Sequence, residues 1–154
     1  MKRFWGWVHY LFEMLGTIQR WRDRAARLYA LDPRSVSERD KLWAIATLRR
    51  EALHVQKATG PLPEDYGAYS VALALFVAGL NDPRAIDSLA LVTEIAPAIP
   101  RALAAFGDRA VDALIRTLPS PYLRRSAAYT LRACLASGSL SAGKALAVER
   151  ALVQ

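Results

Sequence analysis

Apolar residues recur with a helical period along most of the chain. In the first segment, from about Arg3 to Leu31, apolar side chains lie three or four positions apart and form one stripe, at Phe4, Val8, Leu11, Leu15 and Ile18. Runs of β-branched residues in strict alternation, which are typical of half-buried strands, do not occur in the sequence. The pattern therefore predicts an all-α protein.

Capping and breaking residues predict a helical hairpin over residues 1–60. Asp32-Pro33 ends the first segment, because the residue before a proline disfavours the helical conformation. Ser35-Val36-Ser37-Glu38 fits the S-x-x-E capping box, in which the serine caps backbone N–H groups and the glutamate reaches back to the cap. It predicts a second helix, stopped by Gly60-Pro61, whose apolar face consists of Leu42, Ile45, Ala46, Leu48, Ala52, Leu53 and Val55.

The same signals divide residues 64–154 into helix pairs with short turns. Breaks are predicted at Asp82-Pro83, Pro97 and Pro100, Gly107-Asp108, Ser120-Pro121 and Gly138. The helices are expected to end near Leu80, Ile95, Phe106, Leu118, Ala136 and Gln154. Asp108 and Ser120 are expected to cap the helices that follow them. Such pairs bury one face against the partner helix and another against the next pair.

An imperfect internal repeat lies within this second part. Residues 84–89, Arg-Ala-Ile-Asp-Ser-Leu, return 25 positions later as residues 109–114, Arg-Ala-Val-Asp-Ala-Leu. A period of roughly 20–50 residues is the signature of stacked supersecondary units. Leu89 and Leu114 are therefore expected to be equivalent core leucines.

The repeated segments resemble a known family. Asp-Pro-Arg-Ala-Ile-Asp-Ser-Leu at 82–89 and Gly-Asp-Arg-Ala-Val-Asp-Ala-Leu-Ile at 107–115 resemble the first helix of the phycobilisome-lyase type of HEAT repeat. Residues 120–131 resemble its second helix. The likeness covers roughly residues 64–154 and implies a short, right-handed α-solenoid of antiparallel helix pairs, with the hairpin of residues 1–60 packed as an amino-terminal cap.

Several residues take expected roles from this arrangement. Arg125, Tyr129 and Arg132 share one helical stripe, and the second helices of a solenoid usually line its concave surface, so these three are the candidate partner-binding residues. Arg124 occupies, by resemblance, the arginine position that ties adjacent repeats through an acidic or carbonyl partner. Asp87 and Asp112 recur one repeat apart, which favours a structural cap or an ion pair between repeats.

Positive charge is concentrated in the amino-terminal part. Residues 1–60 hold 12 Lys/Arg and 6 Asp/Glu, a net charge of +6, whereas residues 61–154 hold 9 and 8, a net charge of +1. This asymmetry favours an acidic partner, nucleic acid or an anionic membrane surface, or else reflects a solvated arginine-rich helix face. For the aromatic segment of residues 1–30 three interpretations stay open: a cap on the solenoid, an interfacial membrane helix and a signal peptide.

The sequence contains no catalytic or metal-binding constellation. His9 and His54 lie in different helices, and Cys134 is the single cysteine, so the roughly four convergent ligands of a zinc site are missing. No P-loop, dinucleotide-binding or nucleophile-elbow pattern occurs, and no cofactor is expected. A lone cysteine and the absence of long apolar runs favour a reduced, cytoplasmic setting, with peripheral membrane association as an alternative.

The sequence thus predicts a non-enzymatic scaffold that binds a protein partner on a concave helical surface. The alternatives are a nucleic-acid-binding solenoid, similar to HEAT-like DNA-alkylation-repair proteins, and an assisting factor for bilin attachment, which rests on the resemblance alone. The last helix carries many apolar residues for a terminal element, and we expect it to support self-association. These residues are Leu140, Leu146, Val148, Leu152 and Val153.

Overall fold

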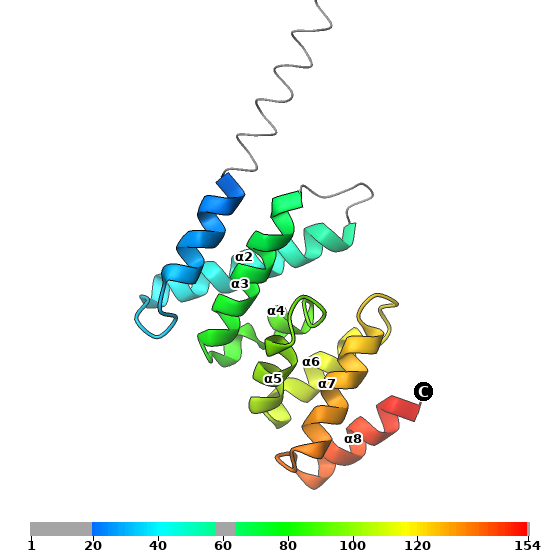
Figure 1. Ribbon diagram of the computed structural model, residues 1–154. Helices are drawn as coiled ribbons and strands as arrows, with labels where there is room; N and C mark the ends of the chain where they lie inside the picture. Colours follow the sequence, from blue (N-terminus) through cyan, green and yellow to red (C-terminus); the bar gives the residue numbers. More distant parts are fainter. Residues whose placement is uncertain (1–19, 58–63, 154) are drawn as a thin grey trace, which may run out of the picture.

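The computed structural model of the chain describes residues 20–57 and 64–153, which are helical and contain no strand (Figure 1). This part of the chain confirms the all-α prediction. Residues 20–30 form the first described helical segment. The elements after it are α2 (Glu38–Lys57), α3 (Glu64–Gly79), a short 3-10 turn (Pro83–Ala85) that leads into α4 (Ile86–Ala90), α5 (Ala98–Ala105), α6 (Asp108–Thr117), α7 (Arg124–Ala136) and α8 (Ala142–Val153).

Each helix packs against the next but one along the chain. α2, α4, α6 and α8 contact one another in succession, and so do α3, α5 and α7. Several helices that are consecutive in sequence also contact each other, α2 with α3, α4 with α5, α6 with α7 and α7 with α8. The helices therefore form two rows that run from α2 to α8 (Figure 1).

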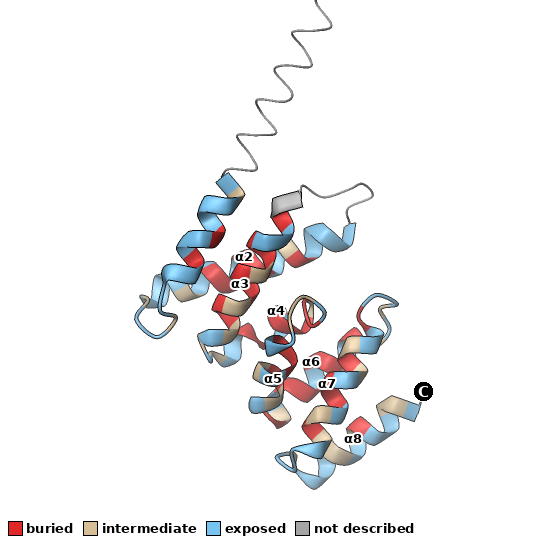
Figure 2. Ribbon diagram, in the orientation of Figure 1, coloured by how far each residue is buried: buried red, intermediate tan, exposed pale blue. Residues whose placement is uncertain are grey.

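One hydrophobic core joins the two rows. It extends from Ala25 and Leu28 to Val148 and forms a single cluster of buried side chains (Figure 2). The hydrophobic core is therefore continuous between the described residues of 1–60 and those of 64–154. Leu89 of α4 and Leu114 of α6, which are equivalent in the sequence repeat, are both fully buried. Complete burial of one leucine side chain stabilises a fold by about 1.5–3 kcal/mol.

The cap of α2 differs from the predicted one. The Ser35 hydroxyl donates to the carbonyl oxygen of Asp32 (2.9 Å), within a turn that precedes the helix. Ser37 is the cap instead, since its Oγ accepts from the backbone N–H of Asp40 (3.2 Å) and its hydroxyl donates to the Asp40 carboxylate (2.7 Å). The cap is therefore shifted by two residues, and the Asp40 carboxylate contacts the Ser37 hydroxyl and not its backbone N–H, as it would in a capping box. The predicted stop of this helix, Gly60-Pro61, lies outside the described residues.

The predicted apolar face of α2 is also partly wrong. Ala44, Ile45, Leu48 and Ala52 are buried, but Leu42 and Leu53 are 49% and 39% exposed. Val55 is exposed as well. The side of α2 that faces α3 and α4 is narrower than the apolar arc of the sequence, so part of that arc is left at the surface.

α4 ends earlier than the sequence predicted, at Ala90 rather than near Ile95. The next five residues form turns, with backbone hydrogen bonds from Val92 to Leu89 (3.1 Å) and from Ile95 to Val92 (3.0 Å). The hydroxyl groups of Thr93 and of Ser126 on α7 are hydrogen-bonded (2.6 Å). This contact outside α4 holds the turn, and a continuing helix would not form it.

Gly107 joins α5 to α6 in a conformation that favours glycine, with φ 57° and ψ −131°. Its N–H donates to the carbonyl of Ala104 (3.0 Å), as expected of the glycine that follows a helix. The prediction that Asp108 caps α6 is wrong, because Asp108 is the first residue of this helix. Its carboxylate accepts from the backbone N–H of Ser141 (2.8 Å), next to the start of α8. Hydrogen bonds from the side chain and then from the backbone of Ser141 lower the pKa of Asp108.

The start of α7 also differs from the predicted one. α7 begins at Arg124, not at Pro121, because the carbonyl of Ser120 first closes a turn with the N–H groups of Leu123 and Arg124.

The last helix, α8, is only partly buried. Val148 is buried, whereas Leu146 is 47% exposed and Val153 is exposed too. Self-association of this end stays a prediction. Within the described ranges, no helix has the length and apolar character needed to cross a membrane.

We expect Leu89→Asp and Leu114→Asp each to unfold the protein. A carboxylate in either position would be fully buried without a partner, at a cost of several kcal/mol against a total stability of about 5–15 kcal/mol. Thermal unfolding followed by circular dichroism measures the effect. Leu42→Asp, at a half-exposed leucine near the start of α2, is the matched control and should keep the melting temperature within a few degrees. A core variant that melts like the wild type would contradict the repeat register.

Candidate functional site

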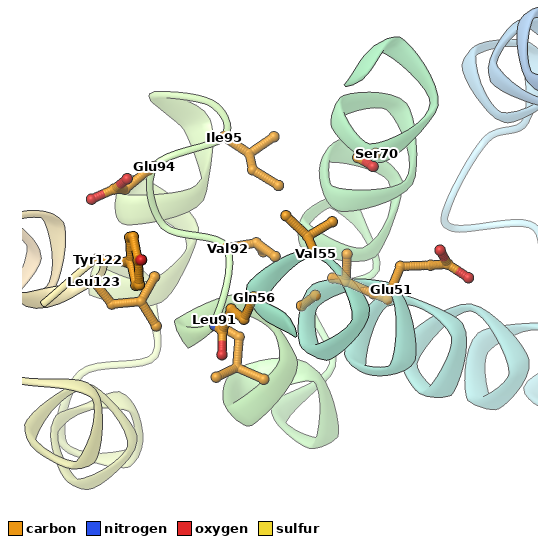
Figure 3. A pocket seen from close by; sticks show the side chains of 12 residues that line it. Glu51, Val55, Gln56, Ser70, Leu91, Val92, Glu94, Ile95, Tyr122 and Leu123 are labelled. Carbon is orange, nitrogen blue, oxygen red and sulfur yellow. The ribbon is translucent and has the colours of Figure 1, made fainter. Parts of the chain in front are cut away.

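A pocket of about 360 Å³ opens between α2, α3, the turn after α4 and the turn before α7 (Figure 3). Its walls are mostly aliphatic and are formed by Leu48, Ala52, Val55, Leu91, Val92, Ile95 and Leu123. Five polar residues also line it, namely Glu51, Gln56, Ser70, Glu94 and Tyr122. Apolar walls with a few convergent polar groups are the usual composition of a ligand pocket.

The pocket exists because neighbouring helices have unequal lengths. α2 has 20 residues, whereas α4, which packs beside it, has five. The last turns of α2 therefore extend past the end of α4. The turn that follows α4 brings Ile95 and Glu94 opposite Val55 without filling the space between them (Figure 3).

Glu51 is held at one side of the pocket by an aromatic cluster. Its carboxylate accepts a short hydrogen bond from the hydroxyl of Tyr66 and also pairs with Arg50 (3.4 Å). Trp21 packs against the rings of Tyr66 and Tyr69, with centroid distances of 5.2 and 4.8 Å. Burial, followed by the hydrogen bond to Glu51, raises the pKa of Tyr66 well above its ordinary value. The hydrogen bond from Tyr66 and the pair with Arg50 thus hold the Glu51 carboxylate in place.

Two other polar groups in the lining lack a protein partner within the described part of the chain. The hydroxyl of Ser70 is buried and makes no hydrogen bond there, although it lies near the Tyr66 phenol. Glu94, across the pocket, is exposed and forms no ion pair with another described residue. A buried hydroxyl without a partner is uncommon in folded proteins.

The predicted partner-binding residues form an exposed stripe on α7. Arg125, Tyr129 and Arg132 all point away from the buried side of this helix, and Tyr129 is 68% exposed. Neither arginine forms an ion pair with a residue that the structure describes. The stripe does not line the pocket, which reaches only Tyr122 and Leu123, just before α7.

The three predicted structural residues all make specific contacts. Arg116 of α6 pairs with Asp87 of α4 (2.6 Å), and Lys144 of α8 pairs with Asp112 of α6 (2.5 Å). The two aspartates therefore link α4 to α6 and α6 to α8. Arg124 instead donates to the carbonyl oxygen of Leu118 (3.0 Å), so it closes the turn between α6 and α7 within one pair and does not tie two pairs together.

Within the described residues there is no group of three or more histidine, cysteine and acidic side chains placed to hold a metal ion. His54 is exposed, and His9 lies outside this part of the chain. Burial raises the pKa of the Cys134 thiol, which disfavours the reactive thiolate.

Sequence reasoning missed the pocket entirely. Its residues come from four segments separated by up to 75 positions, from Leu48 to Leu123. One local feature of the sequence could have indicated an early end of α4. The β-branched residues Val92 and Thr93, shortly before Pro97, weakly disfavour a helix.

Comparisons with known proteins do not show a family for this chain. No protein-family model matches the chain, and neither the curated proteins nor the solved structures contain a significant match to it. The function is therefore inferred from the site itself.

We expect Tyr66→Phe to destabilise the protein by about 1–2 kcal/mol near neutral pH, because Glu51 would lose its hydrogen-bond donor in a partly buried place. When the pKa of a group is higher in the folded state than in the unfolded state, the group stabilises the fold at low pH. This stabilisation is lost as the pH rises. For Tyr66 this loss begins near pH 10, where an unfolded tyrosine ionises.

Urea unfolding at about pH 7 and about pH 10.5 measures both effects. The alkaline loss should be smaller in Tyr66→Phe than in the wild type. Tyr69 and the Cys134 thiol, whose pKa values are also raised by burial, contribute to the remainder. Tyr122→Phe is the control, because this side chain is 75% exposed, and it should change neither value. An unchanged stability in Tyr66→Phe would show that the Glu51 hydrogen bond contributes nothing.

Proposed function

We propose that the chain is a short α-solenoid of HEAT type that works as a protein-binding module. The support comes from the two rows of helices and from a series of ion pairs that connect one helix pair to the next. Glu38 of α2 pairs with Arg84 (2.8 Å), just before α4, and Asp87 and Asp112 continue the series toward α8. The same kind of contact recurs at each step, as expected when similar units are stacked.

The pocket beside α2 is the observation that carries this proposal. Its volume of about 360 Å³ lies in the range of ligand sites and is large enough for one or two apolar side chains. It opens at the surface between elements that are already packed, so it needs no rearrangement to accept a segment of another protein. Preformed pockets of this kind anchor the residues that contribute most to binding.

The charges around the pocket select the partner's chemistry. The lining contains two acidic residues, Glu51 and Glu94, and no cation lines it among the residues that the structure describes. A segment with an aliphatic or aromatic residue next to a lysine or arginine fits this arrangement. The apolar residue supplies most of the affinity, because burial of one such side chain contributes about 1.5–3 kcal/mol. The exposed charge pair contributes less and mainly favours one sequence over another.

We expect peptides selected from a random displayed library against the full chain to be enriched in an aliphatic or aromatic residue beside lysine or arginine. Binding of a selected peptide, measured by fluorescence anisotropy, should weaken at least tenfold in Val55→Lys, which places a cation at the apolar wall. It should weaken a few-fold in Glu94→Lys.

Two substitutions on α8 are matched controls. Val153→Lys and Glu149→Lys make the same changes at exposed positions outside the pocket and should leave peptide binding unchanged. Selected peptides that are acidic, or that bind the pocket variants as tightly as the wild type, would refute the pocket as the binding site.

Nucleic acid binding is the second candidate function, favoured by the cations of the α7 stripe, which form no ion pair with described residues. Arg125 and Arg132 flank the exposed ring of Tyr129 on one helix face. Cations beside an exposed aromatic ring suit a phosphate backbone and a stacked base. Against this function, most of the excess charge lies in residues 1–60, away from this stripe.

We expect Arg125→Glu with Arg132→Glu to leave the melting temperature unchanged, because both side chains are exposed. If the stripe holds duplex DNA, this variant should also lower the slope of log affinity against log salt by roughly two, about one for each phosphate that is no longer neutralised. A salt titration of DNA binding measures it. A wild-type chain without salt-dependent DNA binding, or a variant with the wild-type slope, would remove this function.

A further inference from the structure

The outer face of α2 combines exposed apolar side chains with cations. Leu42 is 49% exposed, Trp43 is 58% exposed and Leu53 is 39% exposed. We define the α2 outer face as these three residues together with Arg39, Ala46, Arg49, Arg50 and Lys57, all of which are exposed. They recur three or four positions apart and lie opposite the buried side of the helix, which carries Ala44, Ile45, Leu48 and Ala52.

Acidic side chains of α2 do not neutralise this face. Glu38 pairs with Lys41 and Arg84, and Asp40 accepts from Ser37 at the start of the helix. Glu51 points toward Tyr66.

Of the four cations on the outer face, Arg50 forms an ion pair with Glu51 at 3.4 Å. Arg39, Arg49 and Lys57 form none with the described residues. The face therefore carries a net positive charge beside its apolar residues.

We propose that the α2 outer face binds the surface of an anionic phospholipid bilayer. The helix would lie along the surface, with Leu42, Trp43 and Leu53 at the boundary between headgroups and acyl chains. The cations around them would contact lipid phosphates and carboxylates. Apolar residues, tryptophan and interspersed cations on one helix face are the composition of interfacial helices. Each cation near an anionic leaflet raises partitioning about fivefold.

This inference goes beyond the proposed protein-binding function and does not depend on it. The pocket is lined by Leu48, Ala52 and Val55, from other sides of α2, so a chain bound to lipid would keep the pocket accessible. A nucleic acid is the less suitable partner for the outer face, because phosphate contacts use the cations and leave Leu42 and Leu53 without a role. Lipid uses both kinds of side chain.

The test is sedimentation of the full chain with two kinds of vesicle, phosphatidylcholine alone and phosphatidylcholine mixed with phosphatidylserine. We expect binding to the mixed vesicles and at least tenfold weaker binding to phosphatidylcholine alone. Arg39→Gln with Arg49→Gln should weaken binding to the mixed vesicles at least tenfold. Arg101→Gln with Arg109→Gln is the matched control, which lowers the net charge equally at exposed positions of α5 and α6 and should change binding less than twofold.

A second matched pair tests the apolar contribution. Leu42→Ser and Leu146→Ser remove leucines that are 49% and 47% exposed, on α2 and α8. Leu42→Ser should weaken vesicle binding at least threefold, and Leu146→Ser should not. All variants change exposed side chains, and unchanged melting temperatures establish that each is folded.

Three results would overturn the proposal. Equal losses in the two arginine pairs would show that net charge alone governs the binding. Vesicle binding that survives every α2 variant would place the membrane contact elsewhere in the chain. Loss of duplex DNA binding in Arg39→Gln with Arg49→Gln, with Leu42→Ser binding vesicles like the wild type, would assign the face to nucleic acid.

Discussion

The helices of this chain are stable because each one buries apolar surface against the next but one. α4 has five residues and cannot persist alone, since isolated helices of that length are marginal in water. Its buried leucine, Leu89, contacts a core shared with α2 and α6. The same constraint applies to every described element, from Ala25 in the first helical segment to Val148 in α8. The rest of the structure follows from this packing.

The pocket lies where two neighbouring helices, α2 and α4, have unequal lengths. Rows of equal helices would close the space beside α2, but α4 stops where Thr93 forms its hydrogen bond with Ser126. The resulting pocket has aliphatic walls and two carboxylates, and the aromatic cluster around Tyr66 fixes one of them. A rigid scaffold that leaves a preformed pocket at the surface is well suited to hold a partner, because little conformational entropy is lost on binding.

α2 contributes to the core and to the pocket with one side, and to a charged outer surface with the opposite side. Leu48 is buried in the core and also lines the pocket, as Val55 does, whereas Trp43 lies on the outer face. An ordinary amphipathic helix has one apolar side, so the exposed leucines of α2 are the feature that packing does not explain. A bound membrane surface would explain them, together with the cations beside them.

The sequence by itself determined what depends on neighbouring residues. It predicted the all-α content, the helix ends at Asp82-Pro83 and Gly107, the equivalent buried leucines Leu89 and Leu114 and the exposure of Arg125, Tyr129 and Arg132, because caps, backbone conformations and the helical period are local properties. The tertiary structure alone decided the early end of α4, the contact of Asp108 with Ser141 next to the start of α8, and the pocket. Each of these depends on a contact between residues 33 or more positions apart, such as Thr93 with Ser126, and no local pattern encodes such a contact.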